Sequence, residues 1–286
     1  MDAALLLPDG RTLAYAGYGD PKGKPVFFFH GMPGSRFFRP PDEITSRLGV
    51  RLITVDRPGY GRSSFQPGRR IPDWPGDIAR LADALDLERF AVAGHSGGGP
   101  YVLACAWQLP ERVKSAAVLC GAGPVEAPGV LDGVKGLVRF GLQFGRYFPW
   151  PIWRLLVWFA YHRRAADPAA VQAEETGSRP PADEKLMRRP EVREACRISE
   201  VEAFRQGLRG MAWEARLLAR PWGFDLAGIR VPVLLWHSDD DATAPVGMGH
   251  AVAARIPGCR ATICPGEGHL LLFPHWEEIL AALTAI

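Results

Sequence analysis

A serine flanked by glycines is the residue of this sequence with the clearest capacity for chemistry. The pattern G-x-S-x-G is matched by Gly94-His95-Ser96-Gly97-Gly98. A serine at a sharp turn between a strand and a helix exposes its hydroxyl group, and small residues two positions before and after it avoid clashes in the strained backbone. The start of the following helix can stabilise a developing anion. The pattern predicts that Ser96 is a nucleophile; the alternative is a glycine-rich turn with an incidental serine.

A serine hydroxyl is a poor nucleophile unless a base removes its proton, and a histidine usually does so. The chain has seven histidines. His269 ends the turn Pro265-Gly266-Glu267-Gly268, directly after an apolar run at 261–264. That position brings it to the sheet edge at which Ser96 lies. The other histidines stand beside the nucleophile, at strand ends, near helices or in the middle of the chain, where structural or surface roles are usual. We therefore predict that His269 is the base.

Three consecutive acids could supply the carboxylate that a catalytic imidazole needs. Asp239, Asp240 and Asp241 follow Ser238, just after an apolar run at 233–236. A carboxylate beside the imidazole fixes its tautomer and stabilises its charged form. The residue types and their spacing leave the choice among the three acids open.

These residues need a scaffold that brings distant parts of the chain together. Apolar runs of strand length lie at 26–29, 52–55, 90–93, 116–119, 233–236 and 261–264. They are continuous, as in strands of a parallel sheet that is covered on both faces. Helical spacing of apolar residues, as in 74–85, separates them. The alternation predicts an α/β fold with ligand chemistry at the carboxyl ends of the strands, and residues 5–18 predict an antiparallel hairpin at one edge.

The set of motifs resembles that of the α/β-hydrolase fold. HGMPG, from His30 to Gly34, resembles the family's H-G-x-P-G oxyanion loop, and DRPGYGRS, from Asp56 to Ser63, resembles its D-x-P-G-x-G-x-S segment. The order serine, aspartate, histidine is also that of α/β-hydrolases and is opposite to that of chymotrypsin. The resemblance runs nearly end to end. It implies a mostly parallel central sheet flanked by helices, with a helical cap inserted after the strand at 116–119.

The resemblance also implies which acid completes the triad. The family's turn reads G-x-x-D-x-x-V-P, which aligns Asp241 with the acid and Pro245 with the proline, whereas Ser238 departs from the glycine. By the same resemblance, the backbone N–H groups of Met32 and Gly97 are expected to form the oxyanion hole. Epoxide hydrolases and haloalkane dehalogenases of the family carry an aspartate at the elbow, so Ser96 argues against both activities.

An insertion interrupts the alternation of strands and helices. We define it as residues 124–224, which hold 16 basic and 12 acidic residues, whereas the rest of the chain holds 18 and 19. An interval of this length is too long to be a loop in a compact domain. We expect a core domain at 1–123 and 225–286 and a helical cap at 124–224, whose second half, about 183–218, forms two polar helices.

The first half of the insertion is rich in aromatic and basic residues. Residues 133–166 contain six Lys or Arg and no Asp or Glu, and nine aromatic residues lie between Phe140 and Tyr161. One interpretation is that the rings roof a substrate pocket, for which Phe144 and Trp153 are the candidates. The other is an interfacial surface that lies in a membrane headgroup region. We favour the roof, because glycines and prolines interrupt any long stripe.

Composition limits the remaining possibilities. The chain has 286 residues, 47% of them hydrophobic, and a net charge of +3, which gives no clustered basic footprint for nucleic acid. Five scattered cysteines without a C-x-x-C pair indicate neither a disulfide framework nor a zinc site. The cysteine pattern leads us to expect a reducing compartment. Because Asp2 stands where an export signal has basic residues, we expect a cytoplasmic location. We expect no metal and no cofactor, and the oligomeric state stays open.

The favoured function is that of a cofactor-independent serine hydrolase acting on an ester of a small or medium, largely apolar molecule. The same triad would serve an aminopeptidase resembling proline iminopeptidases, a carbon–carbon bond hydrolase or an acyltransferase. Recognition of a free amino terminus calls for acids in the cap, and Glu200, Glu202 and Glu214 keep that alternative open. A ligand receptor built on a hydrolase scaffold is the non-enzymatic alternative.

Overall fold

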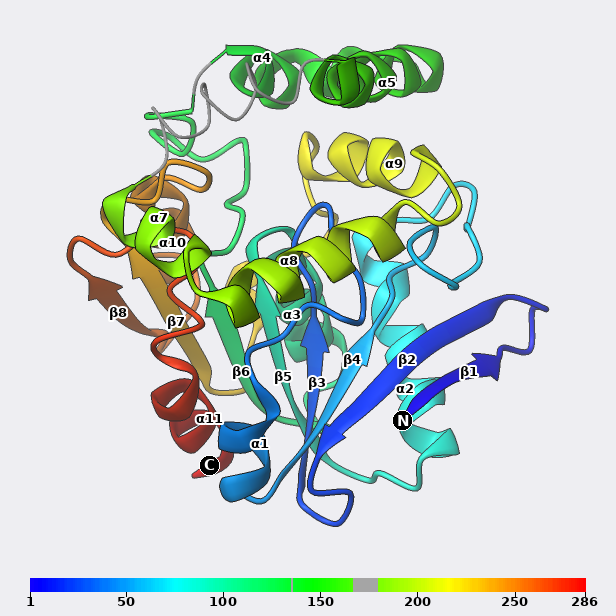
Figure 1. Cartoon of the computed structure of the whole chain (residues 1–286), viewed down its shortest axis with the longest axis vertical. Helices are drawn as coiled ribbons and strands as arrows, with labels where there is room; N and C mark the ends of the chain where they lie inside the picture. Colours follow the sequence, from blue (N-terminus) through cyan, green and yellow to red (C-terminus); the bar gives the residue numbers. More distant parts are fainter. Residues whose placement is uncertain (135, 167–179) are drawn as a thin grey trace.

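The centre of the molecule is a twisted β-sheet, and helices cover both of its faces. The computed structural model describes residues 1–134, 136–166 and 180–286, and within them the sheet has eight strands in the order β1-β2-β4-β3-β5-β6-β7-β8 (Figure 1). The strands are β1 (Asp2–Leu6), β2 (Thr12–Gly19), β3 (Lys24–Phe29), β4 (Val50–Val55), β5 (Phe90–His95), β6 (Val113–Leu119), β7 (Val233–Ser238) and β8 (Arg260–Cys264).

The directions of the strands agree with the hydrophobic pattern. β1 and β2 form an antiparallel hairpin, and β2 also runs antiparallel to β4. The remaining neighbours, in the order β4, β3, β5, β6, β7 and β8, all pair in parallel. Successive side chains of a strand point to opposite faces. Phe27 and Phe29 accordingly pack into one buried cluster, whereas Val26 and Phe28 pack into another on the opposite face. The predicted fold class, with its edge hairpin, is confirmed.

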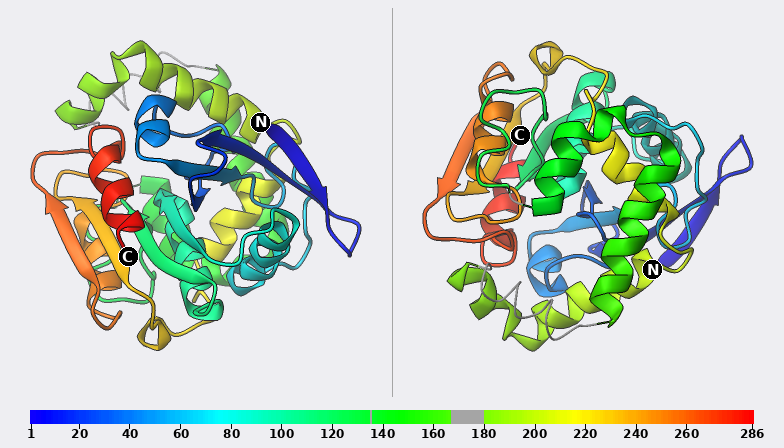
Figure 2. Two further views of the ribbon diagram at one scale, coloured as in Figure 1. Left: turned by 90° about the horizontal axis from the view of Figure 1, so that it is seen from below. Right: turned by 90° about the horizontal axis from the view of Figure 1, so that it is seen from above.

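Helices cover both faces of this sheet. α2 (Trp74–Ala84), α3 (Gly99–Gln108) and α10 (Val246–Ala253) contribute to the cluster that contains Phe27, and α1 (Asp42–Arg47) and α11 (Trp276–Thr284) contribute to the other. Figure 2 shows the helices on the two sides. Short 3-10 turns lie at η1 (Ile71–Asp73), η2 (Ser96–Gly98), η3 (Gly145–Tyr147) and η4 (Leu226–Gly228).

The helices of the insertion lie beyond the carboxyl ends of the parallel strands (Figure 1). They are α4 (Gly136–Phe144), α5 (Trp150–Ala166), α7 (Pro181–Met187), α8 (Pro190–Ala203) and α9 (Arg209–Leu218). The second half therefore has three helices and not the two that we expected, because Pro190 starts a new helix directly after α7. Of the predicted cap, residues 135 and 167–179 lie outside the described residues, and its boundaries as a domain stay a prediction. In the described ranges, no helix is long and apolar enough to cross a bilayer.

Candidate active site

Ser96 lies at the sharp turn between β5 and α3. Its φ of 54° is in the left-handed region, which a non-glycine residue rarely adopts. The glycines around it are required by close approach: a Cβ on Gly94 would lie 2.7 Å from Val102 Cγ2, and one on Gly98 would lie 2.3 Å from the carbonyl oxygen of Phe29. Such backbone strain concentrates at functional sites. The structure thus places the serine hydroxyl at a strained elbow above the sheet.

His269 and Asp241 meet at the ends of β8 and β7. The Nδ1 atom of His269 lies 2.7 Å from Asp241 Oδ2, and the Asp241 side chain is completely buried. The other carboxylate oxygen, Oδ1, accepts hydrogen bonds from the amides of Thr243 and Ala244, both at 2.8 Å. The carboxylate is therefore fixed in orientation, and Nδ1 of the imidazole is the nitrogen that carries the proton toward it.

The pKa shifts of Asp241 and His269 are those expected of a carboxylate beside a basic imidazole. Burial acts to raise the pKa of Asp241, but the charge and hydrogen bond of His269, with the Ala244 amide, outweigh it and lower the pKa to about 2. Burial acts to lower the pKa of His269, whereas the carboxylates of Asp241 and Asp183 act to raise it, and the net shift is upward. A carboxylate that stays charged beside an imidazole strengthens the imidazole as a proton acceptor.

Ser96 and His269 line one cavity of about 230 Å³. The residues from the core that share it are Gly31, Met32, Pro33, Phe38, His95, Thr243 and Leu270, and those from α8 are Cys196, Ser199 and Glu200. The cavity thus lies between residues at the carboxyl ends of the strands and residues of the insertion. Elements far apart in sequence converge on one small space beside the serine.

Met32, which lines this cavity, lies next to Gly97. A Cβ on Gly97 would lie 3.0 Å from Met32 Cβ and 3.5 Å from its amide nitrogen. Gly97 is in the first turn of the helix that follows Ser96, where backbone N–H groups have no acceptor within the helix. The structure therefore brings the two predicted oxyanion-hole residues together beside Ser96.

Arg57 holds the loop that carries Met32. Its guanidinium group donates hydrogen bonds to the carbonyl oxygens of His30 and Gly31, the latter at 2.9 Å. Its Nε donates to Glu214 Oε1 of α9 at 2.8 Å, and both side chains are completely buried. The arginine of the D-x-P-G-like segment thus joins the oxyanion loop to a helix of the insertion, a role that the motif alone did not indicate.

The backbone of His269 is held on both sides, by contacts that sequence reasoning missed. Asp183 of α7 accepts hydrogen bonds from the amides of His269 and Leu270, both at 2.8 Å. His95 Nε2 lies 2.8 Å from the carbonyl oxygen of His269. A Cβ on Gly268 would lie 2.3 Å from the Asp183 carboxylate, so glycine there permits the contact. Nothing in the sequence pattern around Asp183 distinguishes it from a solvated helix acid.

His95 acts in this arrangement as a neutral donor. Burial and the neighbouring His269 lower its pKa to about 3. Because its partner is a carbonyl oxygen, Nε2 must carry the proton. The sequence leads us to expect a structural or surface role for His95, and the structure places it, buried, against the backbone of the loop that carries His269.

Ser238, which stands where the family's turn before the acid has glycine, makes two hydrogen bonds through its hydroxyl group. Its hydroxyl group donates to the carbonyl oxygen of Glu267 and accepts from the amide of Asp240 at 3.1 Å. Asp239 accepts from the amide of Gly266 at 2.8 Å. The turn that carries Asp241 is therefore joined directly to the turn that carries His269, so the serine adds a contact that glycine would lack.

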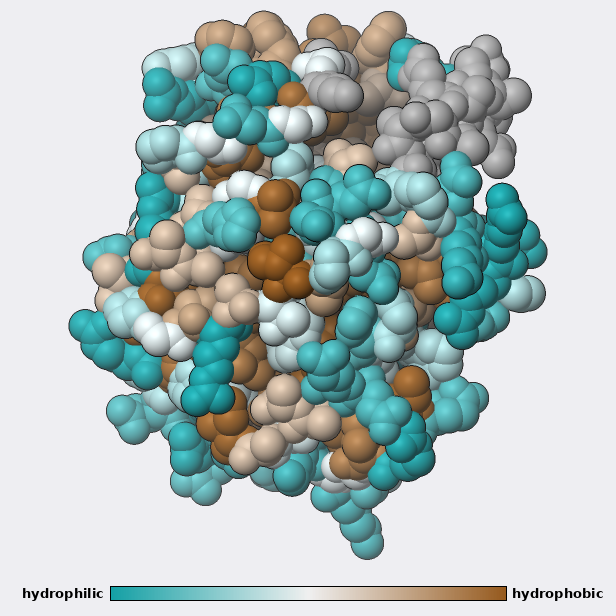
Figure 3. Space-filling model, turned by 90° about the vertical axis from the view of Figure 1, so that its left-hand side faces the viewer, coloured by the Kyte–Doolittle hydropathy of each residue, from teal (hydrophilic) through white to brown (hydrophobic). Residues whose placement is uncertain are grey.

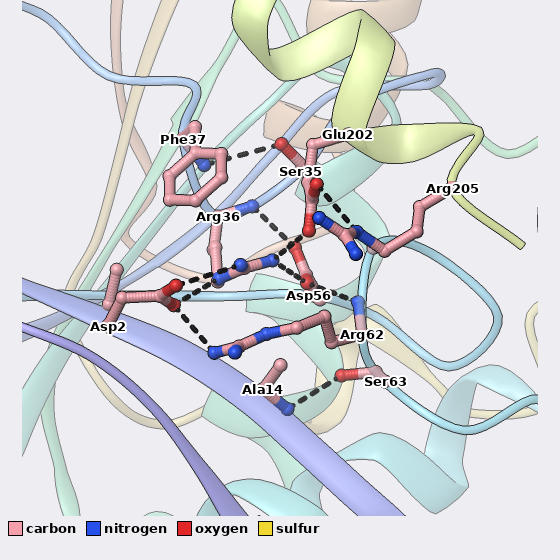
Figure 4. A network of polar contacts seen from close by, with 12 residues as sticks. Asp2, Ala14, Ser35, Arg36, Phe37, Asp56, Arg62, Ser63, Glu202 and Arg205 are labelled. Atoms are coloured by element: carbon pink, nitrogen blue, oxygen red, sulfur yellow. Dashed lines mark hydrogen bonds and ion pairs between the residues drawn. The ribbon is translucent and has the colours of Figure 1, made fainter.

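The three glutamates of the insertion have different environments. Glu214 is paired with Arg57, and Glu202 is paired with Arg36 at 2.8 Å. Figure 4 shows Arg36 between the carboxylates of Asp2, Asp56 and Glu202. Glu200 alone among the three lines the cavity beside Ser96. Of the acids considered for recognition of an amino group, Glu200 is the one that faces the site.

The structure does not place Phe144 and Trp153 where we expected them. Neither is among the residues lining the cavity of Ser96. Phe144 is 43% exposed on the outside of α4. Trp153 is buried, and its Nε1 donates to the carbonyl oxygen of Gly145 at 3.1 Å. Since Gly145 has no side chain, α5 approaches η3 closely and the Trp153 ring packs between helices instead of roofing the pocket.

One group of possible metal ligands occurs in the described ranges. Ligand atoms of Cys120, Asp241 and His269 lie within 4.8 Å of one another. Burial and the neighbouring Asp241 raise the pKa of the Cys120 thiol well above its usual value, which keeps it protonated and a poor ligand. Asp241 and His269 are already engaged with each other. These residues are better suited to proton transfer than to holding an ion.

Comparison with known proteins places this geometry in a family. A 36% identical segment of 126 residues matches a non-heme chloroperoxidase of Streptomyces lividans and covers 41% of this chain and 44% of that protein, so the match spans less than half of the relative. A putative carbamate hydrolase, RutD, of Azorhizobium caulinodans is 31% identical over 241 residues, which cover 83% of this chain and 81% of that protein. An esterase of Thermogutta terrifontis superimposes with a TM-score of 0.67 at 25% identity, covering 100% and 96% of the two chains.

A family model matches most of the chain. The model described as the alpha/beta hydrolase family matches residues 26–282, which include the elbow serine, the acid turn and the histidine turn. The sheet order, the strained serine and the motifs of the oxyanion loop agree with that match. The chain belongs to the alpha/beta hydrolase family.

Proposed function

We propose that the protein is a serine hydrolase that cleaves a carboxylic ester of a small, largely apolar molecule. The observation that carries the proposal is the 2.7 Å contact between His269 and the buried Asp241, at a cavity that also contains the strained Ser96. Nucleophile, base and orienting acid are the parts that acyl transfer needs. Membership of the alpha/beta hydrolase family supports the same reaction class.

The residues fit an acyl-enzyme mechanism. His269 Nε2 takes the proton of the Ser96 hydroxyl as the oxygen attacks the ester carbonyl carbon. Asp241 stabilises the resulting imidazolium, and the amides of Met32 and Gly97 stabilise the oxyanion. The intermediate then collapses: the bond to the alcohol oxygen breaks, and the alcohol leaves with the proton from His269. A water molecule, deprotonated by His269, attacks the acyl-serine and releases the carboxylic acid with a regenerated Ser96.

The cavity supports a small substrate. Its volume of about 230 Å³ is smaller than the roughly 300 to 1,000 Å³ of pockets for drug-sized ligands. Met32, Phe38 and Leu270 give it apolar walls. A short acyl group or a small alcohol group suits these dimensions, and both the carbon–carbon bond hydrolase and the acyltransferase remain alternatives because they use the same residues with a different bond or acceptor.

A second candidate function is removal of an amino-terminal residue, and Glu200 is the observation that favours it. A carboxylate that lines the cavity could pair with the ammonium group of an aminoacyl substrate. The two candidates differ in one measurable preference. Aminoacyl esters and amides should be cleaved faster than their N-acetylated forms by an aminopeptidase, whereas a simple esterase should not distinguish them, and Glu200→Gln should remove any such distinction.

The proposal is tested with a hydrolysis screen over esters of increasing acyl and alcohol size, run beside Ser96→Ala. We expect turnover of short-chain esters by the wild type and a loss of several powers of ten in Ser96→Ala. A fluorophosphonate probe should label the wild type and not the variant. Absence of labelling in the wild type would favour the ligand receptor, and full labelling of Ser96→Ala would refute the assignment of the nucleophile.

A further inference from the structure

Helix α5 is apolar on two opposite faces, only one of which is covered. Its inner stripe, Trp153 and Val157, is buried against alanines of α9. Its outer stripe consists of Ile152, Leu155 and Phe159, which recur at spacings of three and four residues and are exposed, Leu155 by 62% and Phe159 by 56%. An apolar stripe on a helix normally packs against another element. The outer stripe is instead largely exposed in the described part of the chain.

Neighbouring residues add further exposed apolar side chains to this stripe. Of the fifteen large apolar side chains that are exposed in the described part of the chain, nine fall between Val138 and Tyr161. We call the surface the α4–α5 face and define it by Val138, Phe140, Phe144, Tyr147, Ile152, Leu155, Trp158 and Phe159. The helices α4 and α5 form the upper end of the molecule in Figure 1, and the coloured residues along the top of Figure 3 are largely hydrophobic. Apolar patches of this kind mark interaction sites.

The charge of the segment indicates what kind of partner fits. Residues 133–166 contain six Lys or Arg and no Asp or Glu. Arg154 is exposed between Trp153 and the outward Leu155, and the Arg146 guanidinium lies 4.6 Å from the centre of the Tyr147 ring. A second copy of this chain would bring like charges against each other, which costs free energy. A surface of anionic phosphates would instead be attracted.

A hollow beside the α4–α5 face has the same character. A cavity of about 480 Å³ lies between α5 and α9. Apolar side chains and two arginines line it together: Pro151, Leu155, Trp158, Leu208, Arg154 and Arg209. Apolar walls beside guanidinium groups suit a molecule with a hydrocarbon part and an anionic head. The hollow and the exposed rings therefore point to the same chemistry.

We propose that the α4–α5 face binds the surface of a membrane that contains anionic lipid. The exposed rings and Leu155 enter the headgroup region, and the arginines lie at the level of the phosphates, as in interfacial amphipathic helices. Helix α5 then lies in the plane of the membrane and does not cross it. The proposal concerns this surface alone and does not depend on the reaction at Ser96.

Sedimentation of the full chain with lipid vesicles tests the proposal. We expect the protein to bind vesicles of phosphatidylcholine containing about a quarter phosphatidylglycerol, and not vesicles of phosphatidylcholine alone. Binding should weaken as the salt concentration rises from about 0.01 M to about 0.15 M, because the Debye length falls from about 30 Å to about 8 Å.

Two pairs of variants separate the apolar and the charged contributions. Leu155→Ser combined with Phe159→Ser should weaken binding at least about tenfold, whereas Val201→Ser, at a 64% exposed position on α8, should not. Arg154→Gln should weaken binding by about fivefold, whereas Arg260→Gln, which removes the same charge from exposed β8, should not. Thermal unfolding of each variant shows that it is folded.

Three results would overturn the proposal. They are the absence of binding to anionic vesicles, equal binding to both kinds of vesicle, and unchanged binding of the Leu155→Ser, Phe159→Ser variant. Sedimentation velocity without lipid measures whether the chain is a monomer or a dimer. A wild-type dimer that the same variant converts to a monomer would assign the face to a second copy of the chain.

Discussion

At the scale of single residues, His269 is controlled through both its ring and its backbone. Asp241 contacts the ring, whereas Asp183 and His95 contact the amide and the carbonyl of the same residue. A base must be held within a fraction of an ångström of its working position. The position of the imidazole and its pKa therefore depend on residues outside the proposed triad as well.

The pH dependence of activity follows from the upward shift in the pKa of His269. Because the base must be neutral, kcat/KM should rise with pH to a midpoint above the usual histidine value of about 6.5. Asp241→Asn should lower the plateau by about four powers of ten and move the midpoint to lower pH, since the main group that raises the pKa is gone. Asp240→Asn, at the exposed neighbouring position, should change neither. A midpoint that Asp241→Asn leaves in place would contradict the assignment.

Part of this site could be predicted from the sequence, and the reason is local. Ser96, Asp241 and His269 each follow an apolar run, and parallel strands bring such positions to one edge of the sheet. Asp183 could not be found in this way, because it meets the amide of His269 across 86 residues of chain. Every residue except proline has a backbone amide that can donate such a hydrogen bond. The contact therefore produces no sequence motif.

At the scale of elements, α7, α8 and α9 each direct one buried carboxylate into the core. Asp183 binds the histidine turn, Glu202 binds Arg36, and Glu214 binds Arg57 under the oxyanion loop. The continuous apolar runs predicted the strands well, because burial on both faces leaves little freedom of composition. The contacts of these buried acids were not predicted, because the periodicity of apolar residues does not encode polar contacts between distant parts of the chain.

Asp183→Asn tests the contact between α7 and the histidine turn. We expect kcat/KM to fall by up to about a hundredfold, and the midpoint of the pH profile to move to lower pH, because the Asp183 charge also raises the pKa of His269. A purely structural residue would leave that midpoint unchanged. Glu184→Gln, one position further along α7, is the matched control and should keep both the rate and the midpoint.

The two ion pairs should differ in their effect on stability. Glu214→Gln removes the carboxylate partner of the buried Arg57 and should lower the free energy of unfolding by about 3 to 5 kcal/mol. Glu202→Gln should cost clearly less, because Arg36 keeps the carboxylates of Asp2 and Asp56. Urea unfolding of both variants measures the difference. Equal losses would show that the remaining acids do not compensate Arg36.

At the scale of the whole molecule, buried histidines make the stability of the folded chain depend on pH. Burial lowers the pKa of His30, His95 and His237 below the usual value of about 6.5. Below that pH the unfolded chain binds protons that the folded chain does not, so stability is lost as the pH falls. His269 has the opposite shift, but its contribution is fully present below about pH 6.5 and adds no slope there.

The free energy of unfolding should therefore fall between about pH 6.5 and pH 5, and His30 and His95 together should contribute up to roughly 3 kcal/mol per pH unit. Urea unfolding at several pH values measures this slope. His237→Gln, which keeps a donor for the carbonyl oxygen of Ala244, should reduce the slope, because the pKa of His237 is lowered in the folded chain. A stability that is constant over this range would show that these histidines are protonated in the folded chain.

The buried acids of α7, α8 and α9 also set a rule for building chimaeras. If residues 180–220 were exchanged for the corresponding segment of a relative, the partners Arg36, Arg57 and the amide of His269 would stay behind in the recipient. A donor that lacks the acid facing Arg57 would leave that guanidinium group buried without a counter-charge. Donor segments for recombination libraries should therefore be chosen first by these three acids and only then by the shape of the pocket they provide.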